Sequence, residues 1–448
     1  INLRGFSMQS EQLNVGDYFN LPNPGLRAYF AHVERGNSEV YRPPFWKGVA
    51  PNQVISNLKK LIDTSNVKAK WPELYEYEME QLGKIGPMSI QKPLSERLGD
   101  VKDYYTFGAI EGEPLDEMAI QVTLDEFSQI KGIRPRSYPS TVADMRLSTN
   151  SGNPYFAKRD SVKDKTLPLT VGSDFQELKG KRWPITAVLG WRGQEGGPTV
   201  EDTKQRVVFM MPFGVNIAEL AVYQPFITGV QRHNLIPAYV SMDAVDNAVT
   251  QLFDTKDSDD LVVCTDFSKF DQHFNYSLQN AARSLISGLL TPGNDQWLEE
   301  VFPIKYNIPL TLNESVIYSG HHGMGSGSGG TNADETLVHR AMQHEAALAD
   351  GAKLNIYSQC LGDDGILSWP GITVDKVMQS YTRHGLEMNE TKQYESTHDC
   401  VYLRRWHSLD YRVDNTLVGV YPISRVLGRL LYQERFYDPD KWNAQMVT

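Results

Sequence analysis

The spacing of apolar and polar residues predicts where this chain forms helices. In several stretches apolar side chains recur at intervals of three and four, the period of a helix that is buried along one face. Pro225 interrupts one of these stretches and is expected to kink its helix, because proline cannot donate the backbone hydrogen bond of a helix interior. The helices that we predict on this basis are 51–67, 71–83, 216–233 and 275–290.

Shorter apolar runs predict strands. Residues 261–265 (LVVCT) form a short, largely β-branched run, as expected of a buried strand. Residues 304–324 indicate a pair of strands. The stretch IYSQCLGDDGILSW (356–369) has apolar residues on both sides of a polar turn, which predicts a β-hairpin. The chain therefore mixes helices and strands, and we find no internal repeat in it.

The other segments show little periodicity. Residues 1–50 are rich in Asn, Pro and Gly and are interpreted as an extension, and Pro and Gly break 133–200 into predicted strands and loops. GSGSGG (325–330) precedes a predicted helix at whose start Thr331 and Asp334 have the spacing of a capping pair. Backbone N–H groups in such a loop suit phosphate or ribose contacts, but the Lys of a P-loop is missing.

Length and composition narrow the class of protein. A chain of 448 residues with 40% hydrophobic and 22% charged residues is expected to fold into roughly two to four globular subdomains. We find no apolar run of membrane-spanning length and no signal-peptide pattern, so we expect no membrane partner. The three cysteines lie far apart and form no Cys-x-x-Cys pair, which argues against a zinc site and favours a reducing compartment.

The net charge of −11 argues against a protein that coats nucleic acid over its outer surface, because the phosphate backbone attracts basic surfaces. Basic residues nevertheless cluster locally, as in KRDSVKDK (158–165), KGKR (179–182) and TKQR (203–206). The sequence is therefore still compatible with an internal basic channel that holds nucleic acid.

Three carboxylates occupy the ends of predicted strands. Asp266 closes the strand 261–265, and Asp363 and Asp364 lie at the tip of the predicted hairpin. One interpretation is turn formation alone, because Asp-Gly is favoured in two-residue turns and Gly365 follows Asp364. The other is a metal site: if strand and hairpin are neighbours, the carboxylates converge and cannot all stay ionised without a cation. Oxygen ligands favour Mg²⁺ or Mn²⁺ over zinc.

Three motifs stand in one order along the chain: Asp-x4-Asp (266–271), Ser-Gly-x3-Thr (326–331) and Gly-Asp-Asp (362–364). Their order and spacing resemble motifs A, B and C of viral RNA-dependent RNA polymerases. DFSKFDQHF with SGSGGTNADETLVHRAM is most similar to the picobirnavirus polymerases, with partitivirus enzymes as relatives. This resemblance, over roughly residues 180 to 415, implies template-directed synthesis of RNA from rNTPs with two Mg²⁺ or Mn²⁺ ions, for replication and transcription of a viral, double-stranded RNA genome.

The resemblance also assigns roles to the acidic residues. Asp266 and Asp363 match the two metal-binding aspartates, and Asp364 matches their third acidic neighbour. Asp271 matches the carboxylate that senses the incoming ribose. Glu335 stands where such enzymes commonly have Asn or Asp, and this is a departure from the family pattern.

Other motifs supply candidate nucleotide and RNA contacts. Ser326, Gly327 and Thr331 match the motif B loop and its helix start, and Asn332 is a candidate for the ribose contact. EDTKQRVVFMMP resembles motif F, and its Lys204 and Arg206 match residues that line the nucleotide entry path. GLEMNETKQYES resembles motif D, and its Lys392 is either the acid that protonates pyrophosphate or a plain surface lysine. CVYLRRWH resembles motif E, and its Arg404 and Arg405 match contacts of the primer backbone.

The implied fold is a right hand of the α+β class, in which an antiparallel palm sheet is backed by helices. RNA template, RNA product and rNTPs are the expected partners, with a viral capsid protein as a further one, and the expected location is the virion interior and the host cytoplasm. The expected divisions are an extension at 1–50, fingers at 51–255 and 301–325, palm at 256–300 and 326–415, and a thumb or C-terminal segment at 416–448.

Two other functions stay open at this point. A reverse transcriptase carries an aromatic-x-Asp-Asp hairpin and an aromatic gate against the ribose hydroxyl, so Gly362 and Asp271 argue against it. A catalytically silent, capsid-associated RNA-binding protein has no need of intact Asp266, Asp363 and Asp364. An incorporation assay without other proteins separates this last function from a polymerase.

Overall fold

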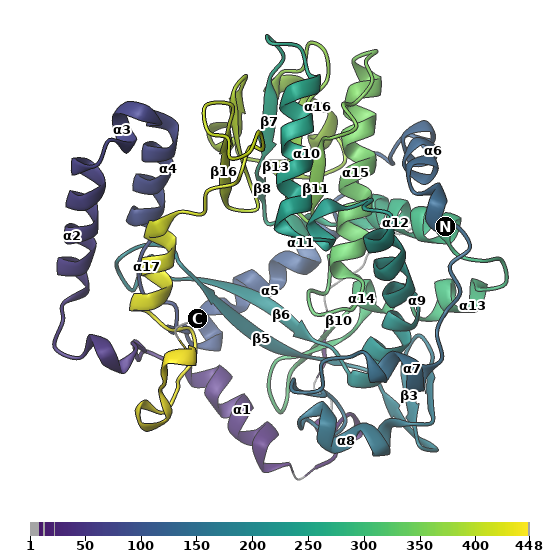
Figure 1. Ribbon diagram of the computed structural model, residues 1–448. Helices are drawn as coiled ribbons and strands as arrows, with labels where there is room; N and C mark the ends of the chain where they lie inside the picture. The colour runs from purple at the N-terminus through teal and green to yellow at the C-terminus, as the bar shows by residue number, and fades with distance from the viewer. Residues whose placement is uncertain (1–8, 12–13, 22, 447–448) are drawn as a thin grey trace.

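The computed structural model describes residues 9–11, 14–21 and 23–446 (Figure 1). Its central sheet has the strand order β11-β12-β7-β14, and every neighbouring pair is antiparallel. Both faces of β7 are buried: Val263 belongs to one core, and Val262 and Cys264 belong to another. This double burial explains the uninterrupted apolar run in the sequence. The strands are β7 (Val262–Thr265), β11 (Gln359–Leu361), β12 (Asp364–Leu367) and β14 (Tyr394–Ser396).

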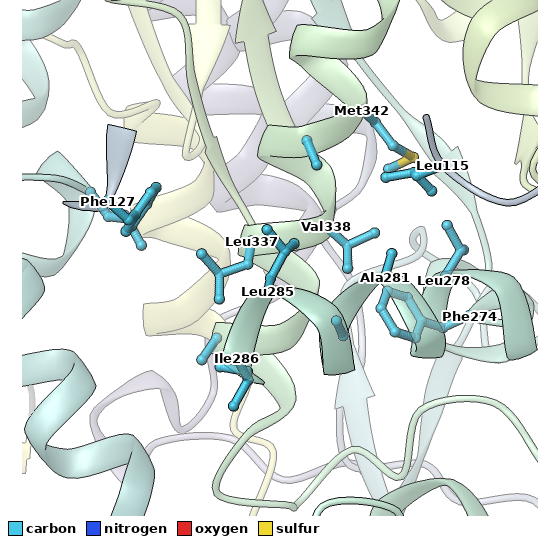
Figure 2. Close-up of a cluster of buried hydrophobic side chains, with 14 of the residues drawn as sticks. Leu115, Phe127, Phe274, Leu278, Ala281, Leu285, Ile286, Leu337, Val338 and Met342 are labelled. Carbon is cyan, nitrogen blue, oxygen red and sulfur yellow. The ribbon is translucent and has the colours of Figure 1, made fainter. Parts of the chain in front are cut away.

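Two helices form the core on one face of this sheet. α12 (Tyr276–Leu289) and α15 (Thr331–Ala349) meet through apolar side chains, which Figure 2 shows. Leu285 of α12 and Leu337 of α15 are both 0% exposed. α6 (Glu117–Glu126) also packs against α15, which is buried along nearly its whole length. α15 therefore provides a fixed support for the side chains that it presents to the sheet.

A second sheet contains a long two-stranded ribbon. Its strand order is β1-β10-β9-β5-β6, in which β5 pairs antiparallel with β6 and parallel with β9. In Figure 1 this ribbon crosses the molecule towards α17 (Ile423–Leu431). There Glu195, just beyond β5, forms ion pairs of 2.8 Å with Arg425 and with Arg429. The strands are β1 (Gln9–Glu11), β5 (Ala187–Gln194), β6 (Lys204–Met210), β9 (Leu310–Thr311) and β10 (Ile317–Ser319).

Segments from the two ends of the chain pack together at the left of Figure 1. α2 (Pro51–Thr64) and α4 (Pro72–Gly83) share a small core with α17. The buried Glu78 of α4 accepts two backbone N–H groups of α17, from Ile423 at 2.8 Å and from Ser424 at 3.0 Å. The boundaries expected at 50/51 and 415/416 therefore separate segments that touch in space, and the subdomain names given to those ranges stay predictions.

The remaining elements complete the layers around these sheets. A small sheet has the order β2-β3-β4, and short pairs join β8 to β13 and β15 to β16. The bounds are β2 (Leu169–Val171), β3 (Phe175–Leu178), β4 (Lys181–Pro184), β8 (Phe267–Ser268), β13 (Glu387–Met388), β15 (Asp399–Tyr402) and β16 (Arg405–Ser408), with α1 (Pro24–Arg35), α3 (Val67–Lys70), α5 (Leu94–Gly108), α7 (Tyr138–Ala143), α8 (Arg159–Thr166), α9 (Phe213–Arg232), α10 (Met242–Thr255), α11 (Phe270–His273), α13 (Asp295–Glu300), α14 (Ile304–Asn307) and α16 (Val374–Thr382).

The structure confirms the long predicted helices and corrects the segments that lacked a clear period. Pro225 lies inside α9, as predicted. Residues 1–50 contain α1, whose buried Leu26, Phe30 and Val33 have helical spacing, and 133–200 contain α7 and α8 as well as strands. In the part of the chain that the structure describes, no helix combines the length and apolar character needed to cross a membrane.

Candidate active site

Asp266 lies at the end of β7, beside the hairpin formed by β11 and β12. Thr265 pairs with Gly365 in antiparallel register, so Asp266 is level with Asp364 and close to the turn residue Asp363. Desolvation by the surrounding protein raises the pKa of Asp266; the exposed Lys392 opposes this rise, and Asp363 adds to it. The predicted pairing of strand and hairpin is confirmed, and it brings Asp266 to Asp363.

The hairpin turn consists of Gly362 and Asp363, because β12 already begins at Asp364. Gly362 has a φ of +58°, which favours glycine at the first central position of a two-residue turn. The interpretation that Asp364 and Gly365 form the turn is therefore wrong. Gly365 lies within β12, where an added Cβ atom would come within 2.7 Å of the His339 ring. Asp363 is left exposed at the tip.

Two residues of α15 hold this turn, and sequence reasoning missed both. The N–H of Gly362 donates to Thr336 Oγ1 at 2.9 Å, and His339 Nδ1 donates to the carbonyl of Gly362 at 2.8 Å. Burial lowers the pKa of His339 to about 4, so its ring is neutral at physiological pH. Thr336 and His339 are three residues apart and therefore lie on one face of α15, but no local sequence pattern indicates that Gly362 is their partner.

Asp364 is in different surroundings from Asp363, although the two are adjacent. Its Oδ2 accepts the backbone N–H of Leu403, at the turn between β15 and β16, at 2.8 Å. Desolvation, and then the charge of Asp363, raises the pKa of Asp364 to about 7. Asp364 therefore joins the two hairpins, whereas Asp363 is available to a ligand.

Asp271 lies in α11, where it meets Glu335 of α15. Burial raises the pKa of Asp271, and a hydrogen bond with Glu335 and the charge of Arg206 on β6 oppose this rise. Glu335 is 5% exposed, and its Oε1 has no hydrogen-bond partner among the described residues. Burial, and then the charge of Asp271, raises the pKa of Glu335 well above its usual value. Both carboxyl groups are therefore harder to ionise than free ones, and Glu335 is the one that holds its proton more strongly.

The glycine-rich loop is packed against β6 and is not a free linker. Ser326 Oγ donates to the carbonyl of Val207 at 3.1 Å. Gly327 has a φ of +135°, and an added Cβ atom there would lie 2.1 Å from the carbonyl oxygen of Phe209. Glycine is therefore required at 327 both by the backbone conformation and by the close approach of β6.

The start of α15 differs from the prediction. The expected capping pair is wrong, because Thr331 Oγ1 donates to a carbonyl of the loop at 3.3 Å and Asp334 forms a buried ion pair of 3.0 Å with Lys305. Asn332 is exposed, and its Oδ1 accepts the hydroxyl of Tyr239 at 2.6 Å. The helix is thus held at its start by tertiary contacts and not by a local cap.

The predicted basic residues divide into exposed and paired ones. Lys204 and Arg206 are exposed on β6, and Arg404 is exposed at the turn between β15 and β16. Arg405 instead forms a two-bond ion pair with Asp246 of α10, at 2.8 and 2.9 Å, and its side chain is 13% exposed. Arg405 therefore fixes the hairpin to α10, and Arg404 is the arginine of the two that faces solvent.

The fold and the site together define a nucleic-acid polymerase, and comparison with known families shows which kind of polymerase it is. The chain belongs to the viral RNA-dependent RNA polymerase family, whose model matches residues 108–418. It is an RNA-directed RNA polymerase, a nucleotidyltransferase that binds RNA and nucleotides. This family confirms the enzyme class and the right-hand fold that the motifs implied, and it sets aside the reverse transcriptase.

The relatives of this chain include picobirnavirus proteins. A potential RNA-dependent RNA polymerase of Human picobirnavirus (strain Human/Thailand/Hy005102/-) is 55% identical over 438 residues, which cover 96% of this chain and 81% of that protein. Crystal structures of the RNA-dependent RNA polymerase of a human picobirnavirus, and of its insertion loop deletion mutant, match with a TM-score of 0.94 and 55% identity. The matches cover 97% of this chain and 84% and 86% of those chains.

The carboxylates at this site suit a divalent cation with oxygen ligands. Asp266 and Asp363 repel each other, and a cation between them would relieve that repulsion. Among the residues that the structure describes, no three His, Cys, Asp or Glu side chains are arranged to hold a metal ion unaided. Mg²⁺ commonly takes one or two carboxylates and completes its shell with water and substrate phosphates, which fits this arrangement.

Proposed function

We propose that this polymerase joins rNTPs to the 3′-hydroxyl of an RNA by two-metal nucleotidyl transfer, with Asp266 and Asp363 as the metal ligands. The observation that carries the proposal is the register of β7 and β12, which brings these two carboxylates together at the end of the sheet. When bound, two such ions activate the attacking hydroxyl and stabilise the leaving pyrophosphate. Asp364 supports the site by joining the hairpin turn to Leu403.

The surrounding side chains bind and orient the substrates. The exposed Arg206 grips the incoming triphosphate with its planar fork, and Lys204 lies on the same strand along the entry path. Lys392, whose charge acts on Asp266, protonates the leaving pyrophosphate. Arg404 contacts the primer backbone from the tip of its hairpin. Ser326 and Gly327 belong to the loop that precedes α15 and packs against β6, and this loop faces the nucleotide.

We assign recognition of the ribose 2′-hydroxyl to Asp271 together with Glu335. Protonated Glu335 donates to Asp271 and holds it, so that the Asp271 carboxylate accepts the hydrogen bond of the ribose. An added Cβ atom at Gly362 would lie 3.6 Å from Glu335 Oε2, so the pair is next to the turn that carries Asp363. Thr331 and Asn332 are the alternative partners of the ribose.

Replacing the metal ligands tests the catalytic proposal. Asp266→Ala and Asp363→Ala should each lower nucleotide incorporation at least about a thousandfold, because each removes several kcal/mol of transition-state stabilisation. The fold should be retained, since both side chains are exposed. Asp259→Ala, also at an exposed aspartate, is the matched control. A folded Asp266→Ala protein that still incorporates nucleotides at the normal rate would rule out the assignment.

Comparing rNTP with dNTP use tests the ribose proposal. A buried site built to bond a hydroxyl rejects the analogue that lacks it by roughly 10⁴–10⁵. Asp271→Ala should therefore reduce kcat/KM for rNTPs far more than for dNTPs. Glu335→Gln should keep most of the selectivity, because its amide N–H still donates to Asp271, whereas Glu335→Leu should lose it. Proportional losses of both activities in Asp271→Ala would show that Asp271 does not read the ribose.

We also propose that the template is a double-stranded RNA genome, copied in the virion interior and the host cytoplasm beside the viral capsid protein. The support is the similarity of the chain to a picobirnavirus polymerase. Incorporation on single- and double-stranded templates, measured with and without capsid protein, tests this. Activity restricted to single-stranded templates under both conditions would contradict it.

A further inference from the structure

The structure assigns a positioning residue that no motif singled out: we infer that Gln393 holds the metal ligand Asp266 and the loop carrying Lys392 in one fixed arrangement. The inference rests on the proposed role of Asp266 as a metal ligand. It concerns the stretch between β13 and β14, where the short 3₁₀ helix Glu390–Lys392 leads directly into Gln393.

Gln393 continues the sheet by one step with its side chain. The backbone ladder between β14 and β7 begins at Tyr394, which pairs with Cys264. Beyond that pair, Gln393 Oε1 accepts the backbone N–H of Asp266 at 3.0 Å, and Gln393 Nε2 donates to the carbonyl of Asp266 at 2.7 Å. One amide side chain thus supplies both the acceptor and the donor that a neighbouring strand would offer to Asp266.

A third hydrogen bond connects the same amide to the loop before it. Gln393 Nε2 also donates to the carbonyl of Asn389 at 2.9 Å. The side chain of Asn389 in turn accepts the N–H of Thr391 at 3.1 Å, at the start of the 3₁₀ helix. These hydrogen bonds hold the two ends of the loop, Asn389 and Gln393, together. Lys392 lies within this loop, and its charge acts on Asp266.

The chemistry explains why an amide is needed at this position. Asp266 lies past the end of β7 and is exposed, and among the described residues Gln393 is the one that bonds both its backbone N–H and its carbonyl. A carboxylate at 393 could accept the N–H of Asp266 but could not donate to its carbonyl. Partners that orient a metal ligand typically contribute 10- to 100-fold to metal affinity or activity, although they do not touch the metal.

Binding of Mn²⁺ alone to the full chain, followed by electron paramagnetic resonance, tests the inference. Gln393→Met keeps the length of the side chain and removes the amide, so its Kd for Mn²⁺ should rise about tenfold or more. The melting temperature should stay the same, because Gln393 is only half-buried. In incorporation assays kcat should fall while the KM for rNTPs changes little. Gln379→Met, at an exposed position of α16, is the matched control and should change neither the Kd for Mn²⁺ nor kcat.

Normal Mn²⁺ affinity in a folded Gln393→Met protein would overturn the inference. Asp266→Ala separates this failure from a failure of the proposed function. If Asp266→Ala loses Mn²⁺ and Gln393→Met does not, only the role of Gln393 is wrong, whereas full Mn²⁺ binding by Asp266→Ala overturns both. Hydrogen exchange on the unaltered protein gives a second measurement: the amide of Asp266 should be protected, and fast exchange there would contradict the hydrogen bond to Gln393.

Discussion

At the scale of single residues, neighbours of the same type act differently because they face different surroundings. Asp363 is exposed at a turn, whereas Asp364 points to Leu403 in the adjoining hairpin. Arg404 is exposed, whereas Arg405 is bound to Asp246. Successive side chains of a strand point to opposite faces, so a doubled residue at a strand end supplies one group to each face. Sequence motifs locate such pairs but do not say which member is free.

Arg206 offers a test of how the substrate is bound. Arg206→Lys should raise the KM for rNTPs roughly tenfold, because lysine keeps the charge but loses the two-bond geometry. The affinity for template RNA should change little. Arg134→Lys, also at an exposed arginine, is the control and should leave both quantities unchanged. An equal loss of template affinity in Arg206→Lys would place this side chain on the RNA backbone instead.

At the scale of elements, the sequence predicted what periodicity determines. The long helices, the strand before Asp266 and the hairpin at 356–369 follow from local patterns, and the structure contains them. The start of α15 was predicted wrongly because a buried partner, Lys305, takes Asp334 away from a local cap. The hydrogen bonds from His339 to Gly362 and from Gln393 to Asp266 were missed because these partners are distant in the sequence.

His339 makes the link between α15 and the hairpin sensitive to acid. Its pKa is about 4 in the folded protein, below the ordinary value of 6.5, so the unfolded chain takes up the proton first as the pH falls. Between pH 7 and pH 5 this should lower the free energy of unfolding by about 2 kcal/mol. The stability that the lowered pKa of His339 contributes is complete above pH 6.5 and is lost as the pH drops towards 4.

His339→Asn isolates this contribution, since asparagine can still donate to Gly362. Urea unfolding at pH 7 and pH 5 should show a smaller loss of stability in the variant than in the unaltered protein. His322 also has its pKa lowered to about 4 by burial, but it is present in both proteins and cancels. Equal losses in the two proteins would contradict a neutral, buried His339.

Glu78 fastens α17 to α4 through the backbone of the helix start. Glu78→Gln should lower the free energy of unfolding by about 1–2 kcal/mol, because it removes the negative charge that two N–H groups and the helix dipole stabilise. Amide exchange at Ile423 and Ser424 should speed up. Glu76→Gln, on the exposed face of the same helix, is the control. Unchanged exchange at Ile423 in Glu78→Gln would exclude the cap.

At the scale of the whole molecule, contacts between distant segments join the parts of the hand. The ribbon of β5 and β6 reaches α17 through Glu195, and α17 rests on α4 from the other end of the chain. The sheet that carries Asp266 combines β7 with strands that follow about a hundred residues later. Local patterns carry no information on such pairings, so the subdomain boundaries expected from the resemblance stay predictions.

The charge of the molecule predicts how RNA binding responds to salt. The net charge is −11, so RNA must be held by a local set of basic groups, and the Kd should rise steeply between about 50 and 200 mM salt as counterions are released. Arg404→Gln should reduce the slope of log Kd against log salt by about 1, which is the contribution of one phosphate contact. Arg134→Gln should not. A Kd that does not depend on salt would contradict binding in a basic channel.

The central proposal is that Asp266 and Asp363 hold divalent ions against the triphosphate, and one crystal soak tests it most directly. Crystals of the full chain soaked with Mn²⁺ and an rNTP should show anomalous density between these two carboxylates and the phosphates of the nucleotide. Gln393 should keep its hydrogen bonds to Asp266 in the soaked crystal. Density for Mn²⁺ at other side chains, with Asp266 and Asp363 in contact with water alone, would contradict the proposal.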